Sequence, residues 1–221
     1  ETGLTQTPWP IVGAITLALA WQLAGIRVAI LTFVALTYLA LLGFWEKSLQ
    51  TIALLGTAAL ISIAIGIPLG VLSGYNRRFA AFLRPVLDFM QAMPAFVYLI
   101  PSVLFFSIGV VPGMFATLIF AMPPGVRMTE LGIRQVDSEV MEAVNAFGAN
   151  RWQQLFGVQL PLALPSIMAG INQTTMMALS MVVIASMIGA RGLGEDVLVG
   201  IQTLNVGKGL EAGLAIVILA V

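Results

Sequence analysis

One stretch of this chain places charged and small residues at fixed spacing inside an otherwise apolar sequence. It begins at Glu142, passes Gly148 and ends at Leu160–Pro161. A glutamate beside small residues suits docking against a partner rather than bond-making chemistry, because no nucleophile and base accompany it. The positions that define the spacing are Glu142, Ala143, Val144, Gly148, Val158, Leu160 and Pro161.

Composition excludes several other kinds of chemistry. Of the 221 residues, 59% are hydrophobic and 9% are charged, whereas a soluble domain has roughly 25% charged residues. The ten basic and ten acidic residues balance, so the chain offers nucleic acid no basic surface. The chain has no Cys and no His, which excludes thiol chemistry, the usual soft metal ligands and the commonest general base. We therefore expect a lipid bilayer as solvent, and no metal or cofactor on this chain.

The apolar runs predict an all-α, polytopic membrane bundle of about seven transmembrane helices. Residues 79–92 are expected to form an amphipathic interfacial helix, 125–159 a charged region and 189–209 a Gly-rich loop. Because the chain lacks an initial Met and its last apolar run is short, we expect it to be part of a longer protein. The expected spans are 11–23, 28–44, 51–72, 94–108, one that begins at 114–122, 160–188 and a truncated one at 210–221.

The distribution of Lys and Arg predicts the orientation. The stretches 73–88 and 125–159 hold six arginines between them, whereas the loops expected on the other side hold Lys47, Arg191 and Lys208. Since basic residues favour the cytoplasmic side, we expect both stretches there and the N-terminus outside.

We expect the charged stretch to fold as two short helices joined at Gly148. Ser138–Glu139 is a suitable helix start, and Glu142 then lies in a first turn that favours acidic side chains. Leu160–Pro161 is expected to end the second helix, since proline disfavours helix at the residue before it. The alternative is an interfacial helix that rests on lipid headgroups. The two expected apolar faces are Val140, Ala143, Val144 and Phe147, and then Trp152, Leu155 and Phe156.

The spacing resembles the EAA loop of ABC importer permeases: Glu-Ala-Ala, three residues, Gly, nine residues, an aliphatic residue, one residue and Leu-Pro. Val144 stands where that pattern has its second alanine. Three longer stretches, 88–98, 159–174 and 178–188, are similar to glycine betaine/proline betaine permeases. The resemblance implies a type I ABC importer permease fold, in which this loop is a cytoplasmic coupling helix seated in a groove of the ATPase.

The resemblance also implies partners and a location. The partners would be ABC ATPase subunits that hold ATP and Mg²⁺, an extracytoplasmic substrate-binding protein and a second permease copy in a homodimer. The location would be the bacterial cytoplasmic (inner) membrane, and the role osmoprotection by import of compatible solutes. Residues 1–44 would be extra N-terminal transmembrane helices, and 45–221 the permease domain. The chain itself has no G-x-x-x-x-G-K-[ST] nucleotide motif.

Several residues are candidates for the substrate pathway. Asn172, Thr175 and Met176 share one face of a predicted span, where unpaired polar groups are costly. Hydrogen bonding between helices is the alternative role. A quaternary ammonium ligand prefers aromatic faces, which makes Phe96 and Tyr98 candidates, with core packing or lipid contact as the alternative.

The Gly-rich loop expected outside holds Arg191, Glu195 and Asp196. The resemblance places this loop at the external mouth, where these residues would dock the substrate-binding protein. Any solvated loop has similar charges, so that alternative stays open.

Three kinds of function compete. An importer subunit requires a separate ATPase, a stand-alone secondary carrier favours an ionisable residue deep in a span, and an intramembrane enzyme needs a nucleophile and a base. The charged residues fall mostly in the expected loops, which favours the importer. The substrate alternative is another small molecule such as an amino acid.

Overall fold

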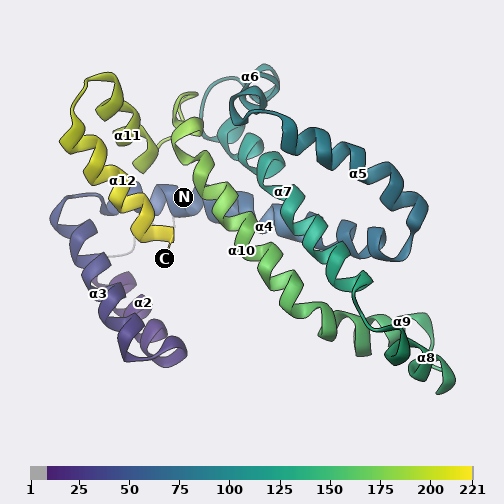
Figure 1. The fold of residues 1–221 in the computed structure, drawn as a ribbon. Helices are drawn as coiled ribbons and strands as arrows, with labels where there is room; N and C mark the ends of the chain where they lie inside the picture. Colours follow the sequence, from purple (N-terminus) through teal and green to yellow (C-terminus); the bar gives the residue numbers. More distant parts are fainter. Residues whose placement is uncertain (1–8, 221) are drawn as a thin grey trace. The chain divides into compact units, whose positions relative to one another are not determined.

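The computed structural model describes residues 9–220, and the regular structure in that range is helical throughout (Figure 1). The predicted all-α fold is therefore confirmed. In chain order the elements are α2 (Trp9–Ala24), α3 (Ile26–Leu41), α4 (Trp45–Tyr75), α5 (Arg77–Ala92), the 3₁₀ turn η1 (Ala95–Tyr98), α6 (Leu99–Phe106), α7 (Val110–Arg134), α8 (Ser138–Ala146), α9 (Arg151–Gln154), the π turn η2 (Leu155–Gln159), α10 (Leu160–Ser186), α11 (Leu193–Gln202) and α12 (Val206–Ala220).

Three helices are long and apolar enough to cross a membrane: α4, α7 and the continuous helix Arg151–Ser186, which comprises α9, η2 and α10. A fourth span exists if α5 and η1–α6, which are bent by 108°, count as one. The expected span over 94–108 does not form a spanning helix by itself, because α6 has only 8 residues. Pro94 explains the break, since Met93 before it is extended at φ −74° and ψ 131°.

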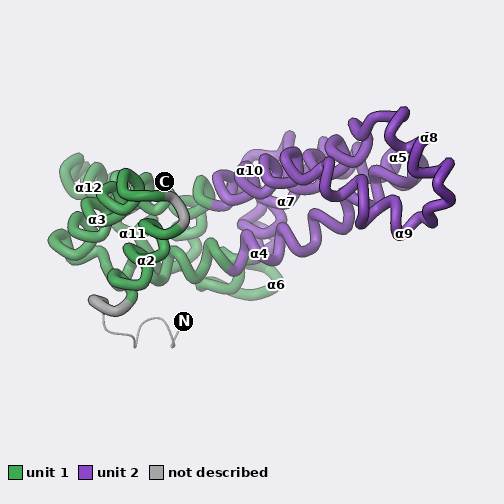
Figure 2. Tube along the Cα trace, turned by 90° about the horizontal axis from the view of Figure 1, so that it is seen from below, with its two compact units in different colours: residues 1–56, 103–114, 179–221 green, residues 57–102, 115–178 purple. Residues whose placement is uncertain are grey.

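The chain packs as two compact units (Figure 2). Unit 1 comprises residues 1–56, 103–114 and 179–221, and unit 2 comprises residues 57–102 and 115–178. The helices α4, α7 and α10 each contribute residues to both units. The predicted division at residue 44 lies inside unit 1 and stays a prediction.

Unit 1 joins segments from both ends of the chain. Leu39 and Phe44 share a buried cluster with Leu193, Ala212 and Ala215. The expected loop over 189–209 is wrong, because α11 forms inside it. The acidic residues Glu195 and Asp196 lie in the first turn of α11, where the exposed N–H groups of a helix start stabilise negative charge.

In unit 2, α4 and α7 approach each other closely along glycines of α4. Gly66, Gly70 and Gly74 follow each other at intervals of four, so they lie on one face of the helix. A Cβ atom added at Gly70 would lie 2.5 Å from Thr129 Cβ and 2.6 Å from the Val126 carbonyl oxygen. Small residues allow this backbone contact, which is the usual way that helices pack tightly in membranes.

Candidate functional site

Three residues, 135–137, separate the end of α7 from the start of α8, and Asp137 forms the N-cap of α8. The carboxylate of Asp137 accepts a hydrogen bond of 2.9 Å from the Glu139 N–H. The expected cap at Ser138–Glu139 is therefore one residue off. A carboxylate caps the free N–H groups well, and Ser138 becomes the first helical residue.

Gly148 forms the predicted bend after α8. Its φ of +75° is the left-handed conformation that glycine adopts without strain. The Gly148 N–H donates to the Asn145 carbonyl at 2.9 Å, which turns the chain away from the helix axis. The Gln154 amide then donates to Asn145 Oδ1 at 2.7 Å and to the Ala149 carbonyl at 2.8 Å, so side chains on both sides fix the bend.

The helix after the bend starts at a capping box and does not stop at Leu160–Pro161. Asn150 and Gln153 exchange side-chain and backbone hydrogen bonds of 2.8 and 2.9 Å. The expected helix end is wrong, because the chain continues into α10 through η2. In this π turn the Leu160 N–H bonds to the Leu155 carbonyl, and the wider turn gives room to the proline ring, which clashes with an ordinary α-helical turn.

The segment 138–156, which we call the coupling segment, leaves apolar side chains exposed. The Phe147 side chain next to the bend is 91% exposed, and Trp152 and Phe156 are also exposed. The rings of Trp152 and Phe156 stack with 5.7 Å between their centroids. Glu142, Ala143 and Gly148 are exposed as well, whereas Val144, Val158 and Leu160 are half-buried and Pro161 is exposed. Exposed apolar groups beside polar ones are typical of a surface that a partner covers.

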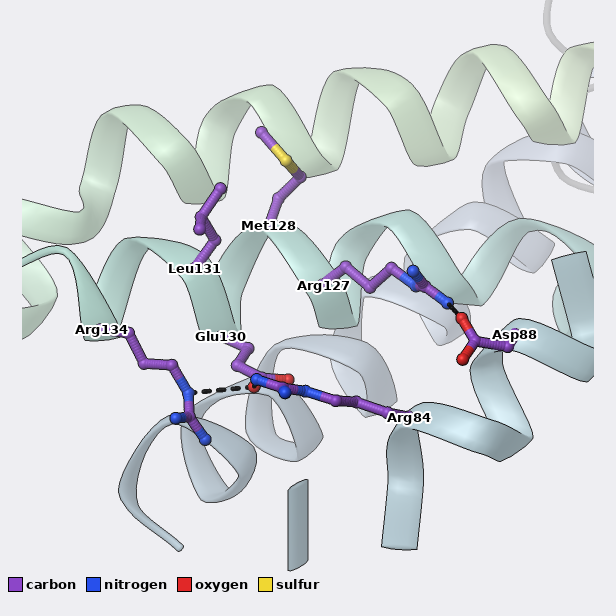
Figure 3. Close-up of a pocket in the computed structure, with 7 residues that line it drawn as sticks. All are labelled: Arg84, Asp88, Arg127, Met128, Glu130, Leu131 and Arg134. Atoms are coloured by element: carbon purple, nitrogen blue, oxygen red, sulfur yellow. Dashed lines mark hydrogen bonds and ion pairs between the residues drawn. The ribbon is translucent and has the colours of Figure 1, made fainter. Parts of the chain in front are cut away.

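A buried carboxylate lies on the last turns of α7 (Figure 3). Glu130 is 6% exposed, and its oxygens accept from Ser73 Oγ at 2.7 Å and Arg84 Nη2 at 2.9 Å. Arg134 Nε lies 3.0 Å from the same carboxylate. A buried charge is costly unless it is paired and hydrogen-bonded, and three donors from three helices satisfy this one. We call Ser73, Arg84, Glu130 and Arg134 the Glu130 cluster.

A second ion pair, Asp88 with Arg127, lies beside the Glu130 cluster (Figure 3). Both pairs border a pocket of about 300 Å³. Sequence reasoning placed Arg127, Glu130 and Arg134 in a loop, because charge in an apolar chain suggests water. Their spacing of three and four residues is the signal that places them on one helix face.

The predicted pathway residues fall in two places within unit 2. Asn172, Thr175 and Met176 are exposed on α10, and the Thr175 hydroxyl donates to the Asn172 carbonyl at 2.7 Å. The Tyr98 ring is buried, its hydroxyl donates to the Met90 carbonyl and its edge meets Phe120 with 5.7 Å between centroids. Phe96 is exposed.

The residues expected to dock a binding protein differ in exposure. Arg191 and Glu195 are exposed, whereas Asp196 is only 4% exposed. Asp196 lies 2.6 Å from Lys47 Nζ and 3.4 Å from Lys208 Nζ, which balance its charge inside unit 1. Its side chain therefore holds α11 against α4 and α12, and a direct contact with a partner falls to Arg191 and Glu195.

The helices and the exposed segment between two spans define a membrane transport subunit with the type I ABC importer permease fold. The fold is that of a chain of the MetNI methionine ABC transporter in an inward-facing crystal form, with a TM-score of 0.71, 22% identity and coverage of 80% of this chain and 89% of that one. The chain belongs to the family of binding-protein-dependent transport system inner membrane components, whose model matches residues 66–221.

Two relatives are similar over almost the whole chain. The glycine betaine transport system permease protein OpuAB of Bacillus subtilis is 50% identical over 220 residues, which are 100% of this chain and 78% of the relative. The glycine betaine/proline betaine transport system permease protein ProW of Escherichia coli is 50% identical over 218 residues, 99% of this chain and 62% of the relative. Membership of this family confirms the prediction of a membrane transport component that works with a binding protein, and not an enzyme.

Proposed function

We propose that this chain is the permease subunit of an ATP-driven importer of glycine betaine, proline betaine and related compatible solutes. One observation carries the proposal: the EAA spacing lies on an exposed helix and bend, in a chain 50% identical over its full length to a glycine betaine permease. The chain would work as a homodimer in the bacterial cytoplasmic membrane, with the N-terminus outside.

In this proposal the coupling segment seats in a groove of the ATPase, which holds ATP and Mg²⁺. Phe147 is the anchor, since a fully exposed aromatic ring gains most from burial against a partner. Glu142 lies on the same short helix, and Gly148 sets the angle at which the chain returns to the membrane. Movement of the ATPase then reaches α7 through residues 135–137 on one side of the segment, and α10 on the other side, where the helix is unbroken.

We assign substrate passage to Asn172, Thr175 and Met176 on α10, with Phe96 and Tyr98 as aromatic contacts for a quaternary ammonium group. The buried Tyr98 ring would need a change of conformation to contact solute, whereas Phe96 is already exposed. Arg191 and Glu195 are proposed to contact the substrate-binding protein.

The test is a complex of the chain, its ATPase and its binding protein reconstituted in vesicles. ATP hydrolysis should rise when the binding protein carries glycine betaine or proline betaine, and less with carnitine or methionine. Stimulation by methionine alone would overturn the substrate assignment.

The variant Gly148→Asp should insert in membranes yet lose ATP-dependent uptake, because the side chain strains the left-handed backbone and adds charge at the contact. Gly157→Asp, whose added Cβ also meets no atom within 4 Å, is the matched control. Undiminished uptake by Gly148→Asp would contradict the role of the coupling segment.

A further inference from the structure

The end of α7 is where the coupling segment joins the membrane helices. Residues 135–137 alone separate Arg134 from α8, so a force on α8 reaches the last turn of α7 first. The question is what holds this turn to the rest of unit 2.

The Glu130 cluster joins this turn to two other helices. Figure 3 shows its members Arg84, Glu130 and Arg134. Ser73 comes from the last turn of α4 and Arg84 from the middle of α5, and both bond to the carboxylate of Glu130. Arg134 closes the cluster, since it pairs with Glu130 and donates through Nη2 to the Ser73 carbonyl at 2.8 Å. The last turn of α7 is thereby bonded to α4 twice and to α5 once.

Charge makes these bonds costly to break. The two bonds to α4 join Ser73 to the Glu130 and Arg134 side chains, which are only 8% and 27% exposed, so movement of α7 away from α4 leaves charged groups poorly solvated without these partners. The Arg84 side chain is 59% exposed and can return to water. The cluster therefore resists movement of α7 away from α4 more strongly than movement away from α5.

Close packing also holds α4 and α7 together. A Cβ atom added at Gly74, one residue after Ser73, would lie 2.7 Å from Ile133 Cγ2. The backbone of α4 thus packs tightly against the Ile133 side chain of α7 beside the Glu130 cluster, and α5 has the weaker hold.

We propose that Glu130 is a positioning residue for coupling, which fixes the last turn of α7 to α4 and α5 so that the three helices follow the coupling segment together. This inference rests on the proposed function. With the carboxylate removed, α8 still docks on the ATPase, but its movement bends the end of α7 and does not reach α4 and α5.

The experiment compares Glu130→Gln with the wild type in the reconstituted complex. The amide keeps the size of the side chain and one acceptor, and removes the charge. We expect assembly and basal ATP hydrolysis within about twofold of wild type, and about tenfold fewer solute molecules taken up per ATP hydrolysed. The double variant Arg84→Gln/Glu130→Gln should be no worse than Glu130→Gln alone, because Arg84 acts through Glu130. Arg78→Gln is the matched control and should behave as wild type. Arg78 is an exposed arginine at the start of α5, the helix that carries Arg84.

Two results would overturn the inference. Equal losses of assembly, hydrolysis and uptake, with an unchanged ratio of solute to ATP, would mean that Glu130 only stabilises the fold. Normal uptake by Glu130→Gln, with as many solute molecules per ATP as in the wild type, would mean that Glu130 has no part in coupling. Failure of the wild-type complex to take up any solute with ATP is distinguishable from both, and would overturn the proposed function together with this inference.

Discussion

Each unit of the molecule holds a buried carboxylate between two cations, and the two units differ in how they hold it. Asp196 in unit 1 meets Lys47 and Lys208, whose side chains are 37% and 44% exposed. Glu130 in unit 2 meets two arginines and a serine hydroxyl. Lysine is a flexible point charge, whereas arginine presents several donors in a fixed plane. Each carboxylate thus joins three helices, but Asp196 does so through flexible point charges and Glu130 through donors whose directions are fixed.

The largest expected effect comes from removing the carboxylate altogether. Glu130→Leu should lower the free energy of unfolding in detergent by about 3 kcal/mol, because the buried Ser73 hydroxyl and the partly exposed Arg134 both lose the carboxylate that they bond to. Asp196→Leu should cost about 1 kcal/mol, since both lysines can turn into water. The measurement is a denaturing-detergent titration of both variants. Equal losses would show that the two sites are held in the same way.

Backbone contact between α4 and α7 gives the next effect. Gly70→Ala should destabilise the chain by about 2 kcal/mol, since the added methyl group meets Thr129 and the Val126 carbonyl. Gly56→Ala on the same helix is the matched control: its Cβ meets no atom within 4 Å, and alanine favours helix. The same titration measures both. A tolerated Gly70→Ala would contradict the close approach of α4 and α7 at this position.

The smallest effect is expected when the hydrogen-bond geometry of a cation changes but its charge stays the same. Arg134→Lys keeps the positive charge but loses the second bond, to the Ser73 carbonyl, and should cost about 1 kcal/mol. Lys47→Arg should change the free energy of unfolding by less than about 0.5 kcal/mol, because only charge is needed beside Asp196. If the lysine were as good as the arginine in unit 2, the contrast between the units would disappear.

Local structure was predictable wherever a single residue determines it. Gly148 was expected at a bend and has the left-handed φ that the bend requires. The helices on either side of it were also expected, with an error of one residue at the cap, because Asp137 competes with Ser138 for the same role. Pro161 misled the prediction, since a π turn just before it removes the clash that normally ends a helix.

Contacts between distant parts of the sequence were not predictable. Arg84 and Glu130 are 46 positions apart, and nothing in either segment alone indicates that they meet. Arg127, Glu130 and Arg134 were therefore counted in the charged region 125–159, although they lie on α7 and find partners on α4 and α5. Asp196 was likewise expected on the surface, and its burial depends on lysines from two other helices. The coupling positions and pathway residues stay predictions until the uptake experiments are done.

The π turn at Leu155–Gln159 also determines which way the side chains after it face relative to those before it. One residue of an α-helix corresponds to about 100° of rotation, and a π turn places one residue more in its turn than an ordinary helix does. The angle about the helix axis between Trp152, before the turn, and Asn172, after it, therefore differs from the angle in a regular α-helix with the same number of residues. A lineage that lost one residue from this turn would return to a regular α-helix with the same faces aligned, whereas a loss between Leu160 and Asn172 would rotate Asn172 by about 100° relative to Trp152.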